Sequence, residues 1–168
     1  MRFQGTVWKF GDDTDTDCII PARFLTVYDE LELARHCFTD VRPGFQDMIT
    51  QGDIIVAGRN FGFGSSREHA PLAIKGVGIS LIVAESFARI FYRNAFNIGL
   101  PLVESPEASR ALAEGTKVSV DLLAGEIEVF DTGERFSCKP LPDLMRHIIE
   151  AGGLVEYVKT KRGHEHVP

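Results

Sequence analysis

The chain is 168 residues long, 44% apolar and 25% charged, and its formal net charge is −6. This length is typical of one domain, and the composition excludes a chain made mainly of disorder, collagen or coiled coil. Because no apolar run approaches the roughly 18 residues of a membrane span and the N-terminus has no signal-peptide pattern, we expect a cytoplasmic protein without a membrane partner. Its acidity argues against nucleic acid as a partner.

The N-terminal part is predicted to alternate short elements with polar turns. Residues 5–10 read as a strand, and apolar side chains at roughly helical spacing predict a helix over residues 29–38. Between them lies an aspartate-rich turn, residues 12–17, because Asp and Thr side chains bond their own backbone. This turn resembles a calcium loop, but it lacks the central Gly and the terminal Glu of an EF-hand, which favours a structural turn.

The middle of the chain is predicted to be an α/β unit in which buried strands alternate with helices. A helix with one apolar and one basic face is predicted to start at Ser86 or Phe87 and to end at Gly99. Short β-branched runs bounded by glycines are typical of strands buried on both faces. Such runs cover residues 52–58, 79–84 and 100–103.

The last third changes character. Alternation with period two over residues 117–122 and 126–130 predicts a hairpin, and residues 134–138 could add a strand. An amphipathic helix is predicted over residues 141–151, and the polar tail, residues 160–168, is predicted to be frayed. The fold class expected from the residues is therefore α/β, with a β region appended to a single domain over residues 1–168.

Residues 60–71 combine a strand end, a glycine-rich turn and the start of a helix. Ser65 and Glu68 match the S-x-x-E capping box, which predicts Ser65 as the N-cap of a helix through about Lys75. In the plainest interpretation, the serine only satisfies a backbone N–H group of this helix.

Two kinds of ligand site are also open for this segment. One is a dinucleotide site of the G-x-G-x-x-G type, although Arg67 stands where the third glycine belongs. The other is a carboxylate or phosphate cradle, in which glycine N–H groups, a helix N-terminus, the Arg67 fork and the hydroxyls of Ser65 and Ser66 face one anion. Residues 59–93 carry five Lys or Arg against two Asp or Glu, which suggests a small anionic ligand.

The sequence offers no other set with catalytic or metal-ligand spacing. Cys18, Cys37 and Cys138 are odd in number and far apart, so neither a disulfide framework nor a metal site is expected on this chain. The histidines do not cluster, and His69 is interpreted as a packing or hydrogen-bonding residue instead of a base.

Three long motifs resemble one known family. Residues 58–71 (GRNFGFGSSREHAP) strongly resemble the signature of the small subunits of 3-isopropylmalate dehydratase, the swivelling domain of the aconitase superfamily. Residues 8–25 (WKFGDDTDTDCIIPARFL) and 86–101 (SFARIFYRNAFNIGLP) resemble the same family, in the same order. The resemblance covers most of residues 5–160 and implies a swivelling β/β/α domain like the C-terminal domain of aconitase.

The resemblance also implies half of a hydro-lyase. A separate large subunit would carry a [4Fe–4S] cluster on three cysteines, this chain would bind no cofactor, and the active site would form between the two. The implied reaction interconverts 2-isopropylmalate and 3-isopropylmalate, both small dicarboxylates, by dehydration and rehydration in leucine biosynthesis. Sister hydro-lyases of the homoaconitase, dimethylmalate and methylcitramalate types share the motifs, and a non-enzymatic anion-binding module is a further alternative.

By motif position, the resemblance implies that Ser65 is the base that removes the carbon-bound proton. It implies that Arg67 binds a substrate carboxylate, with Ser66 and Gly64 as neighbouring contacts. Phe63 stands where many relatives have cysteine. Because the cluster ligands would belong to the large subunit, this departure does not imply loss of the cluster, and its expected effect is on the shape of the pocket.

Residues 24–27 follow the Ile-Ile-Pro motif, and the resemblance implies that this segment reads the variable substituent of the substrate. Thr26 and Val27 are the expected contacts, and relatives of the homoaconitase type have arginine where Thr26 stands. Because the segment carries no cation, we expect it to accept an isopropyl group and to reject an additional carboxylate.

Overall fold

The computed structural model describes residues 1–164, and the first strand of the chain lies in the middle of its sheet. Strand β1 (Arg2–Lys9) pairs in parallel with β2 (Ile54–Ala57) and antiparallel with β5 (Lys117–Asp121). Beyond β2 the parallel half continues with β3 (Leu81–Ala84) and β4 (Leu102–Glu104), and beyond β5 the antiparallel half continues with β6 (Glu126–Val129) and β7 (Arg135–Ser137).

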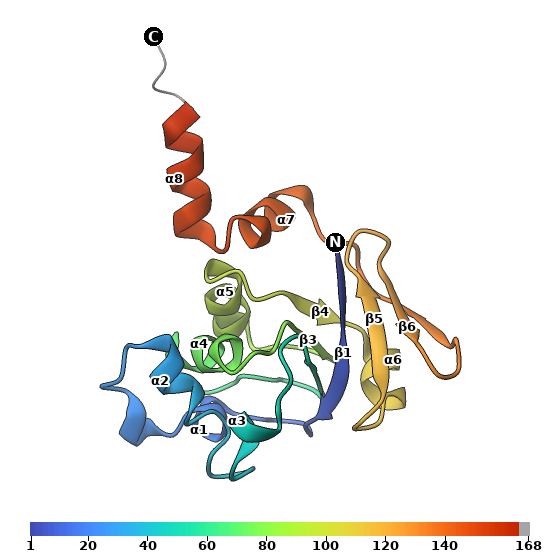
Figure 1. The fold of residues 1–168 in the computed structure, drawn as a ribbon, viewed down its shortest axis with the longest axis horizontal. Helices are drawn as coiled ribbons and strands as arrows, with labels where there is room; N and C mark the ends of the chain where they lie inside the picture. The colour runs from blue at the N-terminus through green and yellow to red at the C-terminus, as the bar shows by residue number, and fades with distance from the viewer. Residues whose placement is uncertain (165–168) are drawn as a thin grey trace.

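Eight α-helices and one 3-10 helix are described around this seven-stranded sheet of residues 1–164. Figure 1 shows α1 to α4 gathered on the side of the sheet away from β5 and β6, while α8 extends away from the sheet. None of the helices in the described part is long and apolar enough to cross a membrane. Their bounds are α1 (Thr16–Ile19), the 3-10 helix η1 (Ala22–Phe24), α2 (Glu30–Ala34), α3 (Phe45–Met48), α4 (His69–Gly76), α5 (Arg89–Asn97), α6 (Pro106–Ala111), α7 (Asp143–Glu150) and α8 (Leu154–His164).

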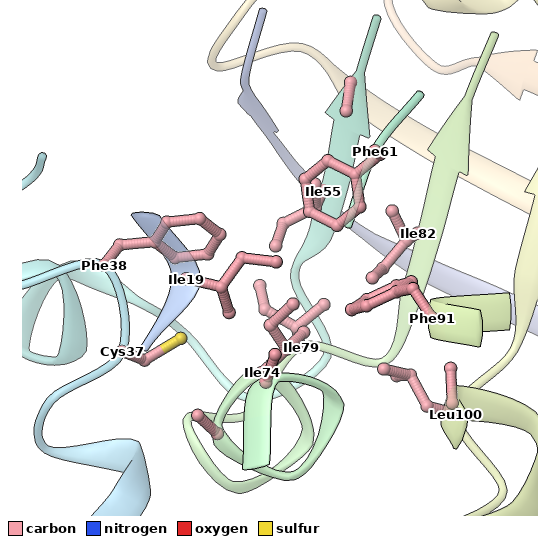
Figure 2. Close-up of a cluster of buried hydrophobic side chains, with 14 of the residues drawn as sticks. Ile19, Cys37, Phe38, Ile55, Phe61, Ile74, Ile79, Ile82, Phe91 and Leu100 are labelled. Carbon is pink, nitrogen blue, oxygen red and sulfur yellow. The ribbon is translucent and has the colours of Figure 1, made fainter. Parts of the chain in front are cut away.

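The two faces of the parallel strands belong to two different cores. Ile55 and Ile82 face the helices and pack with side chains from α1, α4 and α5, as Figure 2 shows. Ile54 and Val83 face the other way, into a core closed by the antiparallel half and by α6. Strands buried on both faces read as continuous apolar runs, which is why β2 (IIVA) and β3 (LIVA) were recognisable from the sequence.

The predicted fold class, α/β with an appended β region, is confirmed, and the sheet curls back towards its own edge. The hydroxyl of Ser105, just after β4, donates a 2.9 Å hydrogen bond to the carbonyl of Ser137 in β7. The predicted strands and the hairpin agree with the observed strands to within three residues. This curled sheet with helices on one outer face is the expected swivelling β/β/α architecture.

One helix prediction needs correction. The helix predicted over residues 29–38 ends as an α-helix at Ala34 and continues as turns, and Phe38 has a positive φ of 55°. The first part of the tail predicted to be frayed, residues 160–168, belongs to α8, which ends at His164, and the fraying itself stays a prediction. Residues 165–168 lie outside the described part.

A buried carboxylate aligns the first two parallel strands. Asp53, at the start of β2, accepts hydrogen bonds from the Thr6 N–H (3.0 Å), the Thr50 N–H (3.0 Å) and the Trp8 indole N–H (2.8 Å). A buried carboxylate is stable only when such donors satisfy it. With β1 and β2 held in register at this end, their carboxyl ends open at the same edge of the sheet.

Candidate active site

Three segments that are distant in the sequence meet at the carboxyl ends of β1, β2 and β3. They are the acidic turn (residues 12–17), the glycine loop (residues 60–68) and residues 85–88. In open α/β sheets, ligands bind outside the carboxyl ends of parallel strands. The segment predicted to carry chemistry, the glycine loop, therefore lies where such folds place their sites.

The glycine loop is hydrogen-bonded to the acidic turn. The Gly62 N–H donates to the Thr14 carbonyl (2.7 Å), and the Thr16 N–H donates to the Phe63 carbonyl (2.9 Å). The Ser65 N–H donates to the Thr16 hydroxyl oxygen (3.2 Å). The loop is thus a short extension of the parallel sheet pattern and not the beginning of a helix.

The other side of the glycine loop is fixed to residues 85–88. The Phe61 N–H donates to the Ser86 carbonyl, and the Ala88 N–H donates to the Phe61 carbonyl, both at 3.0 Å. Gly62, between these contacts, has a φ of +78°, and a Cβ built on it would lie 2.2 Å from the Phe91 ring. No other residue type fits there without a shift of α5, so the loop is clamped between two segments.

The predicted cap of α4 is wrong. The helix starts at His69, its N-cap position is Glu68, and no side chain caps it. Ser65 lies four residues earlier, because the hydrogen bonds to the acidic turn and the φ of +106° at Gly64 hold this part of the loop out of the helix. Ser65 and Ser66 are exposed, and within the described residues neither hydroxyl has a hydrogen-bond partner.

Arg67 is held beside these serines by a carboxylate. Its guanidinium forms an ion pair with Asp17 of the acidic turn, and only 16% of the arginine side chain is exposed. The Nε atom is buried and has no partner within the described residues. The guanidinium is therefore oriented in advance and retains an unused donor. Sequence reasoning missed this pair, although the density of aspartates in the turn signalled partners for cations.

The other aspartates of the acidic turn support backbone structure. Asp12 accepts hydrogen bonds from the Arg59 N–H and from its guanidinium, and this lowers the pKa of the Asp12 carboxyl. Asp13 accepts from the Asn60 side chain (2.9 Å), and Asp15 caps α1 by accepting from the Cys18 N–H (2.6 Å). The interpretation as a structural turn is confirmed by these bonds.

These pairs also reduce the local excess of positive charge. Arg59 and Arg67 are paired with Asp12 and Asp17, and the Lys75 ammonium donates to the Ile98 carbonyl at the end of α5. The net positive charge around residues 59–93 is therefore smaller in the folded chain than the sequence suggests. Arg89 and Arg93, both exposed on α5, have no ion-pair partner within residues 1–161.

The segment predicted to read the substrate, residues 24–27, runs from the last residue of η1 towards α2, and together with the adjacent Tyr28 it is called the recognition segment. The Val27 N–H donates to the Phe24 carbonyl (3.0 Å), Val27 packs on the helical core, and Thr26 is exposed. The nearby cation Arg23 is engaged, because its guanidinium donates two hydrogen bonds to Asp40. The segment presents an apolar and hydroxyl-bearing surface, and Gly64, Ser65, Ser66 and Arg67 lie together on the glycine loop.

The cysteines do not fit a metal cluster. Cys37 is fully buried in the helical core, and burial raises the pKa of its thiol well above the usual value. Within residues 1–161, no three His, Cys, Asp or Glu side chains converge as metal ligands. Within the described residues, the three cysteines are therefore not arranged together as ligands of an iron–sulfur cluster.

Comparison with known proteins supports the resemblance. Residues 20–107 match the family described as the aconitase C-terminal domain. The chain is 55% identical to the 3-isopropylmalate dehydratase small subunit of Heliobacterium modesticaldum, over 96% of this chain and 97% of that one. It is 51% identical to the corresponding subunit of Thermodesulfovibrio yellowstonii, over 99% of each. A crystal structure of 3-isopropylmalate dehydratase from Methanocaldococcus jannaschii superposes with a TM-score of 0.92, at 44% identity and 98% coverage of both chains.

Proposed function

The chain belongs to the 3-isopropylmalate dehydratase small-subunit family, within the aconitase C-terminal domain family, and from this we propose that its glycine loop is one half of a hydro-lyase active site. The enzyme to which such a small subunit belongs, 3-isopropylmalate dehydratase, is a hydro-lyase of leucine biosynthesis. Its reaction removes a proton and a hydroxide from adjacent carbons of isopropylmalate, which gives water and an alkene, and then adds them back in the opposite positions.

Ser65 takes the carbon-bound proton in this proposal. The observation that carries it is an exposed serine hydroxyl that has no hydrogen-bond partner within the described residues and lies two residues from a partly buried arginine. A serine acts as a base only as an alkoxide, which needs a nearby positive charge and little water. Because α4 starts four residues after Ser65, the helix N-terminus contributes less than Arg67, since the field of a helix dipole falls off within the first turn.

Arg67 binds one carboxylate of the substrate. Its planar guanidinium matches a carboxylate with two parallel hydrogen bonds, and the Nε atom without a partner is one of the donors still available. Asp17 holds the guanidinium in place until the substrate binds. Ser66 donates a further hydrogen bond, and Gly64 lets the ligand approach the backbone because it carries no side chain.

The other half of the site comes from a large subunit. The relatives are named small subunits, and the exposed glycine loop has to be covered before an alkoxide can persist. A [4Fe–4S] cluster held by that large subunit would supply Lewis-acid chemistry for the departing hydroxyl. The cysteines of this chain do not take part, in keeping with their separation and with the burial of Cys37.

The test is kinetics of the complex reconstituted with its large subunit. Ser65→Ala is expected to lower kcat by about 10²–10⁴-fold, the usual contribution of a positioned base, with little change in KM. Arg67→Lys is expected to lower kcat and raise KM, because a point charge cannot replace the two-pronged contact. Thr132→Ala, which removes an exposed hydroxyl on the β6–β7 hairpin, is the control. Near-normal turnover by Ser65→Ala would show that the serine is not the base.

A further inference from the structure

One ring contact joins the recognition segment to the glycine loop. The Tyr28 ring, at the end of the recognition segment, lies 5.5 Å from the His69 ring, with the two planes inclined by 51°. His69 directly follows the glycine loop and is the first residue of α4. The segment proposed to read the substrate and the loop proposed to act on it therefore touch through these two side chains.

The start of the recognition segment is held by a second histidine. The Phe24 and His36 rings are stacked, with centroids 3.8 Å apart and planes inclined by 7°. The Arg23 guanidinium lies 4.7 Å from the centroid of the Phe24 ring. The first residue of the recognition segment is therefore held by contacts on both sides of its ring.

Within the described residues, the His69 side chain has a ring contact with Tyr28 and no hydrogen bond or ion pair. Its Nε2 atom is buried and has no hydrogen-bond partner within the described residues. Tyr28 is 82% exposed, and its ring contact within the described residues is with His69. The pair is neither a hydrogen bond nor part of the core, and the proposed mechanism does not use it.

The two helices that start at or just after the two rings are closely packed. α2, which follows the recognition segment, packs on α4 so closely that a Cβ on Gly76 would lie 2.6 Å from the Glu30 carbonyl oxygen. The contact between Tyr28 and His69 therefore lies near the N-terminal ends of two helices that are in close contact.

We propose, on the basis of the function proposed above, that Tyr28 and His69 are positioning residues that set the gap between Thr26 and Val27 on one side and Ser65 and Arg67 on the other. The width of this gap selects the size of the apolar group on the dicarboxylate. A substrate with a smaller group then sits loosely against the base, and small displacements of reacting atoms have large effects on rate.

The first experiment tests the contact in the isolated chain. The NMR signals of the His69 ring protons are expected to move in Tyr28→Ala and to stay near their original positions in Tyr28→Phe, which keeps the ring. Tyr157→Ala is the matched control, because Tyr157 stacks on His147 with centroids 6.4 Å apart, between α7 and α8. Unchanged His69 signals in Tyr28→Ala would overturn the proposal at its first step.

The second experiment measures selectivity in the reconstituted complex. Two substrates are compared by kcat/KM: isopropylmalate and the malate analogue that carries a methyl group in place of the isopropyl group. The ratio of the first value to the second is expected to fall by roughly two- to tenfold in Tyr28→Ala and in His69→Ala, the range for loss of one aromatic pair. Tyr28→Phe should keep the ratio, and Tyr157→Ala should not change it. The double variant should have the ratio of His69→Ala, because the two residues act through one contact.

Two outcomes separate the claims. If the unmodified complex turns over isopropylmalate but the variants keep its selectivity, or if the two single effects add in the double variant, the ring contact has no positioning role. If the unmodified complex does not turn over isopropylmalate, the proposed function itself fails.

Discussion

Arg67 has two anionic partners in this account, one in the chain and one in the substrate. In the chain alone its guanidinium is paired with Asp17, and in the proposed reaction it also binds a carboxylate. An arginine held by a carboxylate loses little side-chain entropy when a second anion binds, because its rotamer is already fixed. Asp17 is therefore as much a part of the site as the residues that touch the substrate.

Thr26 is predicted to set the choice between substrates with two and with three carboxylates. Arg23 is engaged with Asp40, so the recognition segment offers no cation to an extra carboxylate. A charge-assisted hydrogen bond contributes roughly 1.5–3 kcal/mol, so its absence predicts at least about a tenfold preference for isopropylmalate over homoaconitate. Thr26→Arg should narrow or reverse this preference, as measured by kcat/KM for both substrates.

Thr26→Val is the control for this variant, because it removes the hydroxyl without adding a charge. It should keep the preference for isopropylmalate. Equal or better use of homoaconitate by the unmodified complex would contradict the assignment of the recognition segment.

The stability of the folded chain is predicted to depend on pH through the ionisation of Asp12. Hydrogen bonds from the Arg59 backbone and side chain lower the pKa of this carboxyl in the folded chain. A group of this kind stabilises the fold above its unfolded pKa, about 3.9, and the contribution is lost as pH falls through the lower folded value. Asp12→Asn should therefore have a lower Tm than the unmodified chain at pH 7, and the difference should shrink below about pH 4.

The matched control is Asp131→Asn, because Asp131 is exposed and has no ion-pair partner among the described residues. Its effect on Tm should be small at both pH values. A Tm difference for Asp12→Asn that stays constant down to pH 3 would show that the charge of Asp12 does not matter.

At the scale of elements, the strands were predictable and the start of α4 was not. Apolar, β-branched runs such as Leu81–Ala84 predict a buried strand from their composition alone. Ser65 and Glu68 form a valid capping box, but hydrogen bonds from the acidic turn, which lies about 50 residues earlier, hold the serine outside the helix. A local motif cannot report a contact of this kind. The helix α8, which starts after Gly153, was not predicted because its composition is mostly polar.

The residues of the candidate site could be named from the sequence, but the tertiary contacts that hold them could not. The family motif places Ser65, Ser66 and Arg67 on one loop, and their neighbours in the sequence ensure that they stay together. The pairing of Arg67 with Asp17 and the contact of Tyr28 with His69 are tertiary, and no spacing in the sequence encodes them.

The clamp on the glycine loop gives a prediction at the element scale. Gly62→Ala adds a methyl group against the Phe91 ring at a residue with positive φ, so it should lose stability through both strain and overpacking, by about 2–5 kcal/mol together. Gly115→Ala is a matched control, since its φ is +84° and nothing lies within 4 Å of the added atom. Thermal unfolding should show a larger fall in Tm for Gly62→Ala. Equal shifts would show that the Phe91 contact relaxes at no cost.

At the scale of the whole molecule, the chain is predicted to be inactive by itself. No set of cluster ligands is present within residues 1–161, and the serines of the glycine loop are open to water. The purified chain should be colourless, free of iron and without hydro-lyase turnover, and activity should appear on addition of the large subunit. Visible absorption that survives a chelator, or turnover by the chain alone, would contradict this.

The central place of β1 has a consequence for how the chain is made. A ribosome releases β1 first, yet the strand that pairs with its second edge comes much later, since Arg2 is bonded to Asp121, 119 residues further on. Until β5 emerges, the nascent chain can assemble β1 to β4 but leaves a row of backbone groups of β1 without a partner. An unpaired strand edge is a site of association between chains. The second edge of β1 therefore stays open to other chains until residues 117–121 have been added and can pair with it.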